Sequence, residues 1–185
     1  TSKMTKQTTS NKQRGVYNKV KKIIAIGDLH GDMIQLLSIL IHSKLIVRKN
    51  LGVSCISVSD YDIKKWKWTG KDTYLVQLGD IFDGGGRKEV DIFQDYEVEI
   101  YKFLVGLKKL AKKEKGDVLL LMGNHELMNY DKNFKYVQKT TMKKCLVNKN
   151  NDFKYTLENH DCDDRAELFS IPNGPLAKSM SDNVY

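Results

Sequence analysis

Three apolar runs in this chain each end on a glycine that is followed at once by Asp or Asn. The runs, at residues 23–26, 73–78 and 119–122, are short and apolar, as buried strands are. Apolar residues at helical spacing follow the first run over 33–43 and precede the third over about 91–113. Strands that alternate with helices in this way predict an α/β fold.

The remaining segments give weaker signals. Residues 53–58 alternate roughly like a strand, whereas 66–72 read as a turn. Residues 164–170 and 174–180 have the composition of two short helices, separated by Pro and Gly. We expect residues 1–19, which are polar and basic, to be a mobile tail.

Composition limits the class of protein. A chain of 185 residues with 41% hydrophobic residues suits one globular domain, and no apolar run approaches the ~20 residues of a membrane span. Three widely spaced cysteines suggest neither a disulfide framework nor a zinc site, so we expect a reducing, cytoplasmic setting. The net charge of +8 is spread without an aromatic-interleaved basic stripe. We therefore expect attraction of anionic substrates, with no specific nucleic-acid or membrane partner.

The polar residues that follow the three runs form the candidate functional site. In an α/β sheet, side chains just beyond the carboxyl ends of the strands converge on one crevice. Carboxylates, an amide oxygen and imidazoles at such a point suit Mn²⁺, Fe or Zn²⁺. The converging residues are Asp28, His30, Asp80, Asp83, Asn124 and His125.

Each of these residues also has an ordinary explanation when it is taken alone. Asp28 or Asp32 can cap the helix that follows, and an aspartate beside glycine is common in turns. We assign no functional role to His42, on the predicted helix, and we interpret His160, in a polar stretch, as a solvated loop residue. Three such loops in one α/β chain make coincidence improbable, so the joint functional interpretation is favoured.

The three loops carry a family resemblance. Residues 27–31 (GDLHG), 79–85 (GDIFDGG) and 123–126 (GNHE) resemble the signatures of the calcineurin-like metallophosphoesterases. Flanking residues between 22 and 180 resemble the Shewanella-like branch of the phosphoprotein phosphatases. The resemblance implies an α/β fold with a layered β-sheet core flanked by helices, of which residues 20–185 would form the N-terminal part of the catalytic domain.

The resemblance also implies a metal centre. Asp28 and His30 would ligate a first divalent ion, Asp80 would bridge two ions, and Asn124 would ligate the second. Two ions can clamp the attacking and leaving oxygens of a phosphoryl transfer and lower the pKa of a bound water. We expect Mn²⁺, with Fe or Zn²⁺ as alternatives.

The reaction implied by the resemblance is direct attack of a metal-bound hydroxide on phosphorus. His125 would protonate the leaving oxygen as general acid, and Asp83 would fix the tautomer of His125. The expected substrates are phosphoproteins carrying phospho-Ser, phospho-Thr or phospho-Tyr, or small phosphoesters. Two alternatives remain open: a nucleotide or dinucleotide polyphosphate hydrolase on the same fold, and a non-catalytic metal-binding interaction module.

The sequence departs from the family pattern at two points. Gly84 stands where the family has a phosphate-gripping arginine, so Arg87, three residues later, is the candidate phosphate-binding residue. The family completes its second metal site with two downstream histidines, whereas His160 is the only histidine here after His125. We therefore expect these residues to hold the first ion more tightly than the second.

Overall fold

The computed structural model describes residues 20–50, 56–85, 96–137, 145–147, 154–156 and 162–185. The tail predicted at 1–19 lies outside these ranges. The strands are β1 (Lys22–Ile26), β2 (Ile46–Arg48), β3 (Trp66–Trp68), β4 (Thr73–Gln77), β5 (Asp117–Leu120), β6 (Cys145–Val147) and β7 (Lys154–Thr156). The α-helices are α1 (Met33–His42), α2 (Glu97–Lys113), α3 (Asn124–Tyr130), α5 (Cys162–Leu168) and α6 (Pro175–Asn183), and the short 3₁₀ helices are η1 (Val58–Tyr61) and η2 (Ile63–Lys65).

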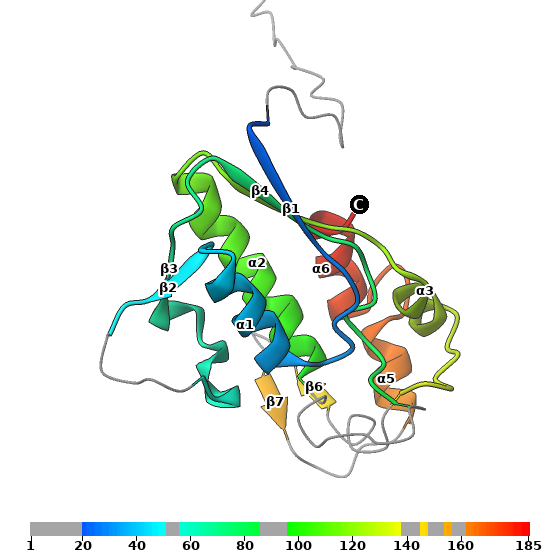
Figure 1. Ribbon diagram of the computed structural model, residues 1–185. Helices are drawn as coiled ribbons and strands as arrows, with labels where there is room; N and C mark the ends of the chain where they lie inside the picture. Colours follow the sequence, from blue (N-terminus) through cyan, green and yellow to red (C-terminus); the bar gives the residue numbers. More distant parts are fainter. Residues whose placement is uncertain (1–19, 51–55, 86–95, 138–144, 148–153, 157–161) are drawn as a thin grey trace, which may run out of the picture.

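A parallel three-stranded sheet in the order β1-β4-β5 forms the centre of the fold. Its register pairs Ile24 with Leu75, and Leu75 with Val118, so three apolar side chains lie in one row. The chain passes from β1 to β4 by way of α1 and from β4 to β5 by way of α2, so both connections cross the sheet in the same direction. Because connections between parallel strands are right-handed as a rule, both helices lie on the same face of the sheet. Figure 1 shows α1 and α2 side by side there, so the predicted α/β fold is confirmed.

The two helices cover the sheet because each has a continuous apolar face. Asp32, one of the two aspartates that the sequence offered as a cap, caps α1 by accepting the N–H of Gln35 at 2.8 Å. Burial of each aliphatic side chain contributes about 1.5–3 kcal/mol of transfer free energy. The buried residues include Met33, Leu36, Leu37 and Leu40 of α1 and Ile100, Phe103, Leu104 and Leu107 of α2.

The last residues of the chain border β5. Val184 forms a parallel bridge with Leu120, and the N–H of Tyr185 donates to the carbonyl of Leu120 at 2.8 Å. The N–H of Met122 in turn donates to the carbonyl of Tyr185 at 3.0 Å. These bonds hold the outer edge of β5 and the residue that precedes Gly123, where the third polar loop begins.

Two local predictions were wrong in the described residues. Residues 66–68 were expected in a turn but form β3, because Trp66 and Trp68 bury alternate side chains while pairing with β2. Residues 56–58 were expected in a strand, yet Val58 begins η1. There the Asp60 carboxylate accepts the N–H of Ser57 at 3.0 Å, a local bond that competes with strand pairing.

The two short helices predicted near the end of the chain are present as α5 and α6. The long helix predicted from about residue 91 ends at Lys113 as expected, but it begins only at Glu97, with Tyr96 as its N-cap. Among the described helices, none combines the length and the apolar character needed to cross a membrane. All three strands of the central sheet point their carboxyl ends at the same edge, toward α3 and α5 in Figure 1.

Candidate active site

Three loops, one after each strand of the central sheet, are joined by hydrogen bonds to Asp80. The N–H groups of Leu29 and His30 both donate to the carbonyl of Asp80, at 2.9 and 3.0 Å. The third loop joins through His125, whose backbone N–H donates to Asp80 Oδ1 at 3.0 Å. Asp80 therefore touches both neighbouring loops, with its carbonyl on one side and its carboxylate on the other.

The backbone is strained at three of the candidate residues. The φ angles of His30, Asp80 and Asp83 are 45°, 56° and 66°, in the left-handed region that favours glycine. Such conformations cost about 1–3 kcal/mol each and persist where surrounding contacts over-determine them. Contacts with the surrounding structure therefore hold the loops in backbone conformations that these residues would not adopt by themselves.

Glu126, which the sequence analysis did not assign, is the main contact that holds this shape. Its Oε2 accepts the N–H groups of Asp80 and Gly123, both at 2.8 Å, and its Oε1 accepts those of Ile81 and Phe82, at 2.8 and 3.3 Å. The side chain is buried, and this burial raises the pKa of its carboxyl, while the four N–H bonds oppose the rise. Glu126 stands at the third position of α3, the spacing of a capping box, which is the signal that could have identified it.

Two glycines allow the second and third loops to meet. Gly79 has a φ of 100°, and a Cβ there would lie 2.5 Å from the Cα of Gly123. A Cβ on Gly123 would overlap the carboxylate of Asp80 and approach Glu126 Oε2 to 2.7 Å. The glycines of the second and third motifs are therefore required by these close contacts.

We expect Gly123→Ala to destabilise the full-length protein by about 1–3 kcal/mol, the usual effect of overpacking. Here and below, the full-length protein means the natural translation product that contains this chain. Gly27→Ala is the matched control, because a Cβ at Gly27 meets nothing within 4 Å. Its free energy of unfolding should be unchanged or raised by up to about 1 kcal/mol. Urea denaturation measures both, and equal midpoints for the two variants would contradict the steric argument.

His30 is oriented so that its ring nitrogen Nε2 can ligate a metal ion. Its Nδ1 lies 3.0 Å from the carbonyl oxygen of Phe82, and a carbonyl can only accept, so Nδ1 carries the proton. The Nε2 lone pair is then free to bind a metal, and Asp28 Oδ2 lies 3.6 Å from Nε2. Asp28 and His30, predicted as ligands of one ion, thus bring their donor atoms together.

A second set of donor atoms converges on the same point. One potential ligand atom from each of His30, Asp80 and His125 lies within 4.8 Å of the other two. Two imidazoles and a carboxylate suit Mn²⁺, Fe or Zn²⁺, so the residues present fit a divalent transition metal. Asn124, predicted as a ligand, is the first residue of α3 and its side chain is exposed to solvent.

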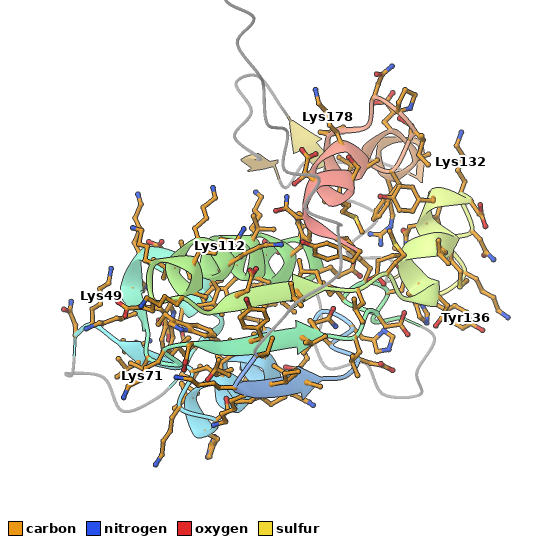
Figure 2. All side chains as sticks on the ribbon, turned by 90° about the horizontal axis from the view of Figure 1, so that it is seen from above. Lys49, Lys71, Lys112, Lys132, Tyr136 and Lys178 are labelled. Atoms are coloured by element: carbon orange, nitrogen blue, oxygen red, sulfur yellow. The ribbon has the colours of Figure 1, made fainter. Side chains whose placement is uncertain are left out.

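His125 also contacts the predicted partner Asp83. Its Nδ1 lies 3.1 Å from Asp83 Oδ2, and its ring meets that of His30 edge to face, with 4.9 Å between the ring centroids. Tyr136 contacts the His125 ring at a centroid distance of 5.3 Å and lies beside α3 in Figure 2. The structure therefore brings His125 close to both Asp83 and the candidate metal ligands.

Asp83 is fully buried and has three further side-chain or backbone partners that the sequence analysis missed. Asn129 Nδ2 lies 2.9 Å from each of its carboxylate oxygens, and Arg165 Nη2 lies 2.9 Å from Oδ1. The backbone N–H of Asp83 donates to Glu97 Oε1 at 3.0 Å. Asn129 follows His125 by four residues on α3, so helical spacing could have identified it.

Arg87, the predicted phosphate-binding residue, and His160 lie outside the described residues. The part of the glycine-rich loop that is described is buried at Gly84 and Gly85. Gly85 donates its N–H to the carbonyl of Tyr136 at 2.7 Å. This bond joins the loop after β4 to the segment after α3, on the side of His125 where Tyr136 lies.

The chain is similar to curated proteins named as phosphatases. It is 40% identical to "Shewanella-like protein phosphatase 1" of Plasmodium berghei over 124 residues, which are 65% of this chain and 27% of that protein. It is 34% identical to "Shewanella-like protein phosphatase 2" of Arabidopsis thaliana over 141 residues, which are 72% of this chain and 30% of that protein. The chain thus spans less than a third of the length of these relatives.

A solved structure and a family profile complete the comparison. A variant of a cold-active protein tyrosine phosphatase superimposes with a TM-score of 0.57 at 24% identity, covering 89% of this chain and 38% of that one, which shows a shared fold. The profile of the calcineurin-like phosphoesterases matches residues 21–180 and so includes all three polar loops. The resemblance seen in the three motifs is confirmed, and the chain belongs to the calcineurin-like phosphoesterase family.

Proposed function

We propose that this chain forms part of a metal-dependent phosphatase that hydrolyses phosphorylated proteins. The observation that carries the proposal is one cluster: donor atoms of His30, Asp80 and His125 lie within 4.8 Å of one another, and His125 is also bonded to buried Asp83. A metal site next to a carboxylate-bound histidine supplies the two things that phosphoester hydrolysis needs, charge neutralisation and a proton for the leaving oxygen.

The proposed metal ligands are those of the predicted set. Asp28 and His30 would hold one ion, Asp80 would bridge, and Asn124 would contribute to a second ion. Bound divalent ions supply a water of lowered pKa and neutralise the charge of the phosphoryl oxygens. The side chain of Asp28 is 63% exposed beside the buried ring of His30, which leaves one side of this group open to solvent and substrate.

His125 is proposed as the general acid. With Nδ1 donating to Asp83, its remaining ring nitrogen, Nε2, is the one that can deliver a proton to the departing oxygen. The side chain of His125 is 13% exposed, so the ring can be reached by a substrate while water is largely excluded.

Support for a protein substrate comes from the relatives, which are named protein phosphatases. Both are much longer than this chain, so activity belongs to the full-length protein. The glycine-rich loop after Asp83 leaves Arg87 as the proposed phosphate-binding residue in place of an arginine at position 84.

The full-length protein loaded with Mn²⁺ tests the proposal. Initial rates are measured on peptides carrying phospho-Ser, phospho-Thr or phospho-Tyr, on a diadenosine polyphosphate and on nitrophenyl phosphate. We expect hydrolysis of at least one phosphopeptide with a higher kcat/KM than that of the dinucleotide. A preference for the dinucleotide would favour a polyphosphate hydrolase, and metal binding without hydrolysis of any substrate would favour a non-catalytic module.

A further inference from the structure

A buried polar cluster lies directly behind the pair of Asp83 and His125. Four side chains compose it, and they come from the loop after β4, the first turn of α2, the last turn of α3 and the middle of α5. Their exposed fractions are between 0 and 4%. The members are Asp83, Glu97, Asn129 and Arg165.

Arg165 is the side chain that joins the other three. Its Nη2 lies 2.9 Å from Asp83 Oδ1 and 3.0 Å from Glu97 Oε2, and its Nε lies 2.6 Å from Asn129 Oδ1. The guanidinium carbon lies 5.5 Å from the centroid of the Phe169 ring, one turn further along. One planar donor group therefore fixes three acceptors from three separate segments.

The chemistry of the donors determines which way Asn129 points. A guanidinium can only donate, so the atom of Asn129 that faces Arg165 is the amide oxygen. The amide NH₂ is then turned toward Asp83, where Nδ2 lies 2.9 Å from both carboxylate oxygens, and it also reaches the carbonyl of His125 at 2.8 Å. Arg165 thus acts on Asp83 twice, once directly and once through Asn129.

The charges of the cluster depend on the same residue. Among the described residues, the buried carboxylates of Asp83 and Glu97 both pair with the guanidinium of Arg165. Burial raises the pKa of Glu97, and the neighbouring charge of Asp83 adds to the rise, while Arg165 opposes both. Without Arg165 the two carboxylates would lie buried and uncompensated, and Asp83 would gain freedom to turn away from His125.

We propose that Arg165 is a positioning residue for the acid step: it holds Asp83 so that Oδ2 faces Nδ1 of His125, and it touches neither substrate nor metal ligand. The inference rests on the proposed function of His125 as general acid. It extends the site to Arg165 of α5, which lies 82 residues beyond Asp83 in the sequence.

The test uses Arg165→Met and Arg165→Lys in the full-length protein, with two substrates that differ in leaving group. A phosphoserine peptide releases a poor alkoxide that needs a proton, whereas nitrophenyl phosphate releases a good leaving group. Arg165→Met should lower kcat on the peptide by about 10- to 100-fold, the usual effect of losing a hydrogen-bond partner behind a site residue, with a clearly smaller loss on nitrophenyl phosphate. KM and metal content should stay unchanged.

Arg165→Lys should fall between the wild type and Arg165→Met on the peptide. An ammonium restores the charge but cannot reach the three acceptors with one planar fork. This variant also keeps the inference testable if Arg165→Met fails to fold, because a wild-type ratio of the two kcat values in a folded Arg165→Lys protein would overturn it.

Arg48→Met is the matched control. Arg48 forms an ion pair with Asp60, with side chains only 16% and 5% exposed, and it lies in β2, at the side of the fold away from α5 in Figure 1. Its removal should lower the melting temperature without changing the ratio of the two kcat values. Equal losses on both substrates in the Arg165 variants, or a loss of metal, would overturn the positioning role.

The outcome for His125→Ala separates the two ideas. If this variant discriminates between the two substrates while the Arg165 variants do not, the positioning inference alone is wrong. If His125→Ala itself loses activity equally on both substrates, the proposed acid is wrong and the inference falls with it.

Discussion

Asp80→Asn is expected to abolish phosphatase activity and to lower the metal content of the full-length protein. Asp80 lies between the other two loops, and its carboxylate is among the donor atoms that converge with His30 and His125. Substitution by Asn removes the negative charge that would serve both proposed ions. Bound metal ions stabilise the transition state by several kcal/mol. Because about 1.4 kcal/mol of activation free energy corresponds to a tenfold change in rate, their loss should lower kcat by ~10³-fold or more.

Elemental analysis of the purified variant measures the metal, and phosphopeptide hydrolysis measures the rate. Asp32→Asn is the control, since Asp32 caps α1 and Asn caps helices about equally well, so metal content and rate should match the wild type. The N–H bond from His125 to Asp80 Oδ1 can be kept by the amide oxygen of Asn, so the fold should survive. An unchanged metal-to-protein ratio in Asp80→Asn would refute a bridging role.

Much of the fold follows from sequence periodicity. The four buried residues of α1 recur at steps of three and four, and the apolar runs that became β4 and β5 bury Leu75, Val118 and Leu120. The run that became β1 was expected to be buried, yet β1 lies at the end of the strand order and buries only Ile26. Such patterns are local and can be read without knowledge of the partner. The strand β3 was missed because Trp66 and Trp68 are only two apolar residues, and their burial depends on packing against distant segments such as Phe103.

Candidate ligands could be placed together from sequence because sheet geometry forces the strand ends to one edge. Their roles remain predictions. The sequence analysis placed Asn124 and His125 in a loop, whereas both lie in the first turn of α3. The N–H groups at the start of this helix make the position favourable for a nearby anion such as Asp80.

The buried supports of the site could not be predicted in the same way. Glu97 and Arg165 form a hydrogen bond although they lie 68 residues apart in the sequence. Neither residue belongs to a sequence motif from which the other could be predicted as its partner. Arg165 was recognised only as part of a short helix, because its role depends on which carboxylates the tertiary structure brings to it. Whether a charged side chain is buried depends on the whole fold. Residues of this kind are therefore identified from the structure and not from the sequence.

His125→Ala is the second change with a large expected effect. Loss of a general acid lowers kcat by typically ~10²–10⁴-fold, and the loss should be greatest for substrates with poor leaving groups. On a phosphoserine peptide we expect the full reduction, and on nitrophenyl phosphate a much smaller one. His42→Ala is the matched control, because His42 is exposed on α1 and bonds only to the carbonyl of Ser38 among the contacts described for it.

Metal content decides between two roles that the geometry of His125 allows. Its ring lies within reach of His30 and Asp80 as a third ligand, yet its Nδ1 is bonded to Asp83 as an acid would require. An acid can be removed without loss of metal, whereas a ligand cannot, since each imidazole contributes to affinity for a transition metal. We therefore expect His125→Ala to keep the wild-type metal-to-protein ratio while kcat falls. A fall in metal that parallels the fall in rate, with equal losses on alkyl and aryl phosphates, would assign His125 to the metal and leave the leaving oxygen to be protonated by another group.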